Sequence, residues 1–97
     1  DMSDGELIAD LYDYCSPGPV KVHVLARAVE ILVSNCTSLP ETVRDVLQSE
    51  ATELDLLSID LEEPGYGLSA EFIDRLAVSR ARILGILKPH LPQASDG

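Results

Sequence analysis

The side chains best suited to metal binding or nucleophilic catalysis are those of two histidines and two cysteines, His23, His90, Cys15 and Cys36. Zinc sites draw their ligands from close pairs such as CxxC or HxxxH, and these residues form no such pair. No serine lies in a GxSxG motif, and neither histidine stands in a pattern typical of a catalytic base. We therefore predict that the protein is not an enzyme and holds no metal and no cofactor.

The segment Gly65-Tyr66-Gly67 is rich in glycine, as phosphate-binding loops are. It lacks the GK[ST] ending of such loops, however, and it follows Glu62 and Glu63, whose charges repel phosphate. The sequence therefore predicts no nucleotide site here.

Acidic residues outnumber basic residues by 17 to 7, which gives a net charge of -10. In a chain this acidic, paired carboxylates occur by chance and do not indicate acid–base catalysis. The negative field repels nucleic acid and anionic lipid surfaces, and it favours a basic partner. No apolar run reaches the length of about 18 residues that crosses a bilayer. We predict that the partner is another protein or a second copy of the chain, with no direct nucleic-acid binding and no membrane.

The length of 97 residues predicts one domain, and the composition, 45% apolar with one Phe and no Trp, predicts a mostly aliphatic core. We expect an ordered core over residues 3–91 and a frayed tail over residues 92–97. No signal or transit peptide is visible, and free thiols suit a reducing compartment. We therefore expect an intracellular location, cytoplasmic or nuclear, and a chain that is part of a larger protein or complex.

The longest apolar stretch, Val20–Cys36, predicts a central helix. Its first five residues, Val20–Val24, alternate with a period of two, which is typical of a strand. A run of about 16 residues is nevertheless long for a strand and ordinary for a helix. A helix that is apolar around most of its circumference must be buried against several neighbours. Its polar side chains form a single stripe: His23, Arg27, Glu30 and Ser34.

Capping and breaking residues divide the rest of the chain into further helices. Ser3–Glu6 forms a capping box that begins the first helix, and the cluster Ser16–Pro19 ends it. Ser38–Glu41 forms a second capping box, with the proline in the first helical turn. The helix that follows could be interrupted at Ser49, which could cap a new segment.

The last helix follows the loop Glu62–Gly67. Ser69 is its expected N-cap, and Pro89 ends it near Lys88. We therefore predict an all-α fold, a compact bundle of four or five amphipathic helices with a mostly aliphatic core and no strand.

Both thiols are expected to be free. If the first two helices pack antiparallel, Cys15 and Cys36 lie at opposite ends of a helix that is about 24 Å long. A disulfide needs Cα atoms within about 7 Å of each other.

Two apolar residues near the end of the third helical pattern, Leu56 and Ile59, lie off the stripe formed by Leu54 and Leu57. They indicate either deeper burial or an exposed patch. Our leading hypothesis is a non-catalytic, acidic interaction or self-association domain that binds through Leu56, Ile59 and the loop at Tyr66. One alternative is an acidic inhibitor or immunity-type protein that occupies a basic site on its target. A second alternative is a helical bundle with an apolar ligand cavity.

Two charged residues interrupt apolar helix faces. Arg80 lies within the stripe of the last helix, and Glu50 lies in the same way on the preceding helix. A buried charge is costly unless it is paired, and both residues lie at about the same depth from the intervening loop. We predict a structural ion pair between Glu50 and Arg80. The alternative is that both side chains reach water at the edge of the stripe, and a break at Ser49 would turn Glu50 away.

Overall fold

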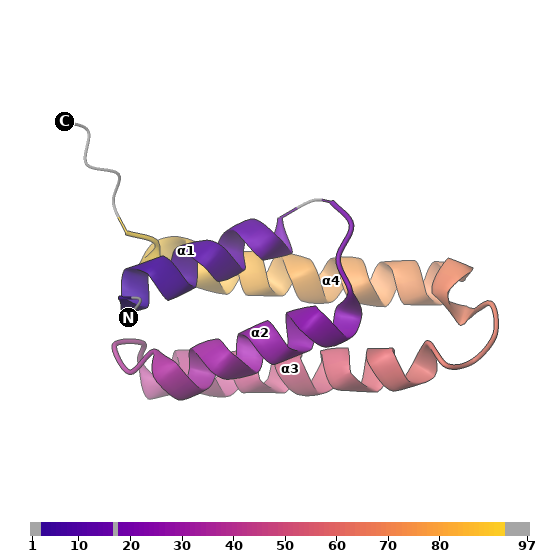
Figure 1. Cartoon of the computed structure of the whole chain (residues 1–97), viewed down its shortest axis with the longest axis horizontal. Helices are drawn as coiled ribbons and strands as arrows, with labels where there is room; N and C mark the ends of the chain where they lie inside the picture. Colours follow the sequence, from indigo (N-terminus) through magenta and orange to yellow (C-terminus); the bar gives the residue numbers. More distant parts are fainter. Residues whose placement is uncertain (1–2, 17, 93–97) are drawn as a thin grey trace.

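The computed structural model describes residues 3–16 and 18–92, which fold into four α-helices, each antiparallel to the one before it (Figure 1). No strand occurs in these residues, so the predicted all-α bundle is confirmed. Pro17 and residues 93–97, most of the tail predicted to fray, lie outside the described ranges. The elements are α1 (Asp4–Cys15), α2 (Val22–Asn35), α3 (Glu41–Asp60), the short 3-10 helix η1 (Tyr66–Leu68), α4 (Ala70–Leu87) and a second 3-10 helix, η2 (Lys88–His90).

The four helices form a bundle in which α1 and α3 each contact both α2 and α4. In Figure 1, α1 and α2 lie in front of α4 and α3. α1 has 12 residues, whereas α3 has 20 and α4 has 18. The hairpin of α3 and α4 therefore extends beyond α1, and the turn between them forms one end of the molecule (Figure 1).

The core is aliphatic, with Phe72 as its one aromatic member among the described residues. All four α-helices contribute to it, and the two thiols of Cys15 and Cys36 are buried within it as free cysteines, as predicted. Small buried thiols pack in such cores much as aliphatic side chains do. The remaining core members are Ile8, Leu11, Val22, Leu25, Ala26, Val29, Leu32, Leu39, Leu47, Ala51, Leu54, Leu57, Ile83 and Leu87.

Two predicted N-caps are confirmed. The Oγ of Ser3 accepts a hydrogen bond from the N–H of Glu6 at 3.2 Å, and the Glu6 carboxylate accepts one from the N–H of Ser3 at 3.1 Å. The Oγ of Ser69 accepts a hydrogen bond from the N–H of Phe72 at 3.1 Å. Each bond satisfies a backbone donor that has no partner within the helix.

The predicted capping box at Ser38 is wrong. α3 begins at Glu41, and its N-cap is Pro40, whose backbone is still extended. Ser38 thus lies too early to cap the helix, and its N–H instead donates to the Asp4 carboxylate at 3.0 Å. This bond ties the turn between α2 and α3 to the start of α1.

α3 continues without a break through Ser49, whose hydroxyl donates to the carbonyl oxygen of Asp45 at 3.2 Å. The central helix, α2, begins at Val22, so the extended start at Val20 is not part of it. Its predicted burial on several sides is only partly correct. α2 packs against α3 and α1, but Val24 is 39% exposed and Ile31 is 45% exposed. One apolar side of this helix therefore faces solvent.

Candidate partner-binding surface at the turn between α3 and α4

Leu56 and Ile59 lie on the outer side of α3. Leu54 and Leu57 of the same helix are fully buried, whereas Leu56 is 50% exposed and Ile59 is 59% exposed. Of the two alternatives left open for these residues, the structure therefore places them in an exposed patch. Apolar side chains held in water in this way are available to pack against another molecule.

Tyr66 lies across the turn from Ile59, on η1. Gly65, just before it, has a φ of 83°, a left-handed conformation that glycine adopts without steric cost. This conformation lets the chain reverse direction within the turn and begin η1 at Tyr66. The Tyr66 ring then packs edge-on against Phe72, with ring centroids 5.8 Å apart. Its apolar body is thus fixed by the core, and its hydroxyl reaches the surface.

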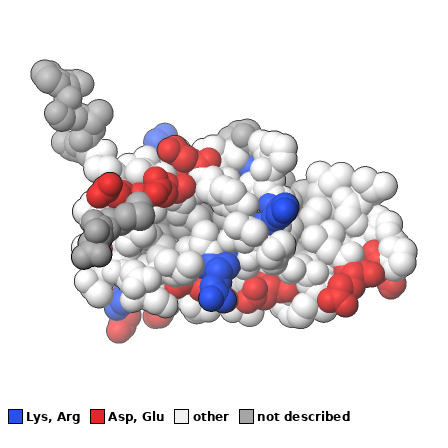
Figure 2. Space-filling model, in the orientation of Figure 1, with Lys and Arg blue, Asp and Glu red and all other residues white. Residues whose placement is uncertain are grey.

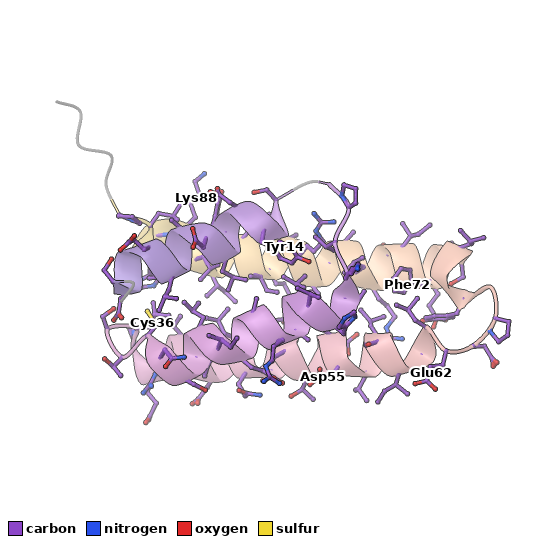
Figure 3. The ribbon with its side chains drawn as sticks, viewed as in Figure 1. Tyr14, Cys36, Asp55, Glu62, Phe72 and Lys88 are labelled. Atoms are coloured by element: carbon purple, nitrogen blue, oxygen red, sulfur yellow. The ribbon has the colours of Figure 1, made fainter. Side chains whose placement is uncertain are left out.

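Ile59 and Tyr66 line one open hollow of about 500 Å³. Figure 2 shows acidic side chains along α3 and at the turn that ends the hairpin. Figure 3 shows Glu62 on the outside of this turn, while Phe72 points inward between α3 and α4. The hollow therefore combines an apolar lining with negative charge. Its other lining residues are Asp60, Glu62, Glu63 and Glu71.

Arg75 of α4 organises one side of the hollow. Its Nη1 donates to Asp60 Oδ2 at 2.9 Å and to the Tyr66 hydroxyl at 2.8 Å, and its Nε donates to Glu53 Oε2 at 3.1 Å. The Tyr66 hydroxyl in turn donates to Glu71 Oε2 at 2.6 Å. Arg75 therefore links both helices to the turn and holds Tyr66 in a single orientation.

The charges around Tyr66 alter its titration. The pKa of the Tyr66 phenol is raised above its usual value, chiefly because the hydrogen bond to Glu71 favours the protonated form. The pKa of Arg75 is also raised, first by its hydrogen bond to Asp60. Both shifts favour the protonated forms of Tyr66 and Arg75, which donate these hydrogen bonds.

Glu62 and Glu63 differ from the acids around Arg75. Among the described residues, neither forms an ion pair within 4.0 Å. Sequence reasoning treated these two residues only as a barrier to phosphate, and it did not identify Glu71 or Arg75 as part of the surface. A detectable signal was the spacing of Glu71 and Arg75, four residues apart on one helix, which allows them to interact.

The structure does not bring Glu50 and Arg80 together. Glu50 is 6% exposed and accepts a hydrogen bond from the hydroxyl of Ser79 at 2.8 Å. Its second oxygen lies 3.7 Å from Nη1 of Arg82, an exposed side chain. The hydrogen-bond partner of Glu50 on α4 is therefore Ser79, the residue before Arg80 in the chain.

Arg80 instead caps the end of α1. Its Nε donates to the carbonyl oxygen of Cys15 at 3.1 Å, and its Nη2 donates to that of Ser16. Carbonyls at the end of a helix lack partners within the helix, and a cation there also interacts favourably with the helix dipole. Arg80 thus joins α1 to α4. Burial raises the pKa of the neighbouring Cys15 thiol to about 11.

Comparison with protein-family models, with curated proteins and with solved structures finds no match for this chain. Within residues 3–16 and 18–92, no group of three or more His, Cys, Asp or Glu side chains could hold a metal ion. No helix in these ranges has the length and apolar character needed to span a membrane. The argument for function therefore depends on the surfaces themselves.

Proposed function

We propose that this chain is a non-catalytic interaction domain that binds a basic segment of a partner protein at the hollow between α3 and α4. The observation that supports this proposal is the combination of Ile59 and Tyr66 with four carboxylates in one open hollow. A segment that carries Lys or Arg beside apolar side chains complements both features. Neither nucleic acid nor an anionic lipid surface would do so, because both are negatively charged.

Each part of the surface has its own role in this proposal. Glu62 and Glu63 receive the basic side chains of the partner, since they form no ion pair within 4.0 Å among the described residues. Leu56 and Ile59 lie about one helical turn apart on the exposed side of α3. Two apolar side chains of a partner helix pack on them, in a helix-against-helix mode.

Arg75 prepares the site before the partner arrives. Because it holds Asp60 and Tyr66 in place, those groups lose little conformational freedom on binding. Arg75 also neutralises part of the charge on the inner side of the hollow. The attraction for a basic partner is therefore greatest at Glu62 and Glu63.

The net charge of -10 adds a long-range attraction for any basic partner. This attraction fits both the interaction-domain hypothesis and the inhibitor alternative, since the two share one recognition chemistry. They differ in whether the basic site on the partner has an activity that binding blocks.

The proposal is tested with a labelled amphipathic peptide of leucine and lysine, and with a matched peptide of leucine and glutamate. Fluorescence anisotropy measures affinity, and two-dimensional NMR of the labelled protein maps the contact. We expect only the basic peptide to bind, with the largest shifts over residues 56–71. Replacing Glu62 and Glu63 by glutamine should weaken binding about tenfold.

The matched control replaces Glu41 and Asp45, both exposed near the other end of α3, by glutamine and asparagine. It changes the net charge by the same amount, and it should alter the affinity less than about twofold. Equal weakening by both double variants would show that only net charge matters and would overturn the proposed site. NMR shifts spread evenly over the surface would do the same.

A further inference from the structure

A second apolar surface lies between α1 and α2, on the side of these helices that faces away from the core. It is a groove of about 360 Å³. Tyr14, 37% exposed, projects into it from the end of α1 and lies between the two helices in Figure 3. Its hydroxyl accepts a hydrogen bond from the N–H of Lys21 at 3.4 Å. The lining residues are Leu7, Asp10, Leu11, Tyr14, Val24, Ala28, Ile31 and Leu32.

The groove exists because α2 has more apolar surface than its neighbours cover. Leu25 and Val29 of α2 are fully buried, but Val24 and Ile31 are each more than one third exposed. These two side chains follow one another along the helix at a spacing of seven residues, so they form a continuous apolar edge. An additional surface laid on this edge would bury it.

The two walls of the groove carry opposite charge. The outer side of α1 bears Asp10 and Asp13, and that of α2 bears Arg27, with Lys21 just before the helix. Glu30, the acidic residue of α2, lies beside Asp55 of α3. Figure 2 shows acidic side chains over α1 and basic side chains over α2, with uncharged surface between them. Among the described residues, neither Asp10 nor Arg27 forms an ion pair within 4.0 Å. Both are therefore available to a molecule that covers the groove.

We propose that a second copy of this chain covers the groove, in a two-fold dimer whose axis runs along it. Rotation about this axis places α1 of one copy on α2 of the other, so acidic walls meet basic walls twice. Rotation about an axis across the groove would instead place α1 on α1, acid against acid. The charge pattern therefore selects the first arrangement.

The register of α1 and α2 supports specific pairs. Near one end of α1, the Asp4 carboxylate accepts the N–H of Ser38, and near the other end Tyr14 contacts Lys21. Both helices rise 1.5 Å per residue, so the first contact places Asp10 level with Leu32 and the second places it level with Leu25, and Arg27 lies within this stretch. A rotation about the groove axis preserves the level, so Asp10 of each copy comes near Arg27 of the other. Tyr14, Val24 and Ile31 then pack in the centre of the interface.

The dimer should be weak. α1 is only about 18 Å long, so the covered face lies at the small end of specific interfaces, which bury about 1,200 Å² or more in total. The net charge of -10 on each copy also opposes association. A Kd on the order of 10 to 100 µM is expected.

Charge reversal tests this arrangement. Sedimentation equilibrium from about 10 µM to about 1 mM should show a monomer–dimer equilibrium for the unmodified chain. Asp10→Arg and Arg27→Asp each place like charges at both pairs, and each should weaken the dimer at least about tenfold. An equimolar mixture of these two variants restores both pairs and should recover dimerisation as a heterodimer. The matched control, Asp45→Arg on the far part of α3, should leave the affinity within about threefold.

The outcomes separate the proposal from its rivals. Circular dichroism must show that both variants remain helical, which their exposed positions favour. A chain that stays monomeric at about 1 mM would refute the proposal, as would single variants that dimerise normally or a mixture without recovery. An apolar small molecule held in the groove, seen by native mass spectrometry, would also refute it. Peptide binding at the α3–α4 hollow is unaffected by any of these results.

Discussion

Replacement of Ser79 by alanine tests the buried contact between α3 and α4. Ser79 is 1% exposed, and its hydroxyl donates to Glu50 at 2.8 Å. A hydrogen bond to a charged acceptor contributes about 1.5 to 3 kcal/mol, and its loss leaves the carboxylate without that donor in a buried site. The other partner of Glu50, Arg82, is 64% exposed in its side chain and lies 3.7 Å away. Such a pair contributes less than about 1 kcal/mol.

We therefore expect Ser79→Ala to lower the free energy of unfolding by about 2 kcal/mol, and Arg82→Ala to lower it by about 0.5 kcal/mol. Urea denaturation followed by circular dichroism measures both values. For a chain of this size the total is about 5 to 15 kcal/mol, so a change of 2 kcal/mol is readily resolved.

Double-mutant cycles then identify the partner of Glu50. The cycle of Glu50→Ala with Ser79→Ala should give a coupling of about 1.5 kcal/mol, whereas the cycle with Arg80→Ala should be additive within about 0.5 kcal/mol. A larger coupling to Arg80 than to Ser79 would refute the assignment and restore the ion pair that the sequence predicts. A cost below about 0.5 kcal/mol for Ser79→Ala would show that the bond contributes little.

Two further predictions concern a helix cap and a thiol. Ser69→Ala removes the N-cap of α4 and should cost about 1 kcal/mol in urea denaturation, while Ser49→Ala, exposed in the middle of α3, should change stability by less than about 0.5 kcal/mol; equal effects would contradict the cap. Because burial raises the pKa of Cys15 from 9.0 to about 11, the folded state retains a proton that the unfolded state loses. Stability from this group is complete below pH 9 and declines as the pH rises towards about 11, so Cys15→Ala should show a smaller alkaline loss than the unmodified chain, and parallel pH curves would disprove the shift.

Local signals in the sequence predicted local structure well. The caps at Ser3 and Ser69 are confirmed because each needs only side chains within three residues of the helix start. The predicted cap at Ser38 was wrong because a local residue pattern can suit more than one local structure. The same residue types suit a turn, and the extended backbone of Pro40 delays the helix to Glu41.

Side-chain partners between helices were harder to predict. Arg80 and Ser79 are adjacent on α4, and their side chains point about 100° apart around the helix axis. Ser79 faces α3, whereas Arg80 faces the end of α1. The apolar stripe of α4 is wide enough to include both directions, so the sequence pattern alone does not decide which part of it meets Glu50. That depends on the rotation of the packed helix, which all four helices determine together.

The apolar pattern of α2 also did not predict which of its sides would be exposed. The apolar pattern of this helix predicts several neighbours, and the bundle was expected to contain four or five helices. The described residues supply four, and α1 and α3 are the principal helices against α2. Lengthening α1 would not close the groove, because Leu7 to Tyr14 already line it along most of α1. A further helix laid on α2 would cover the edge at Val24 and Ile31, and in the proposed dimer α1 of the second copy takes this position.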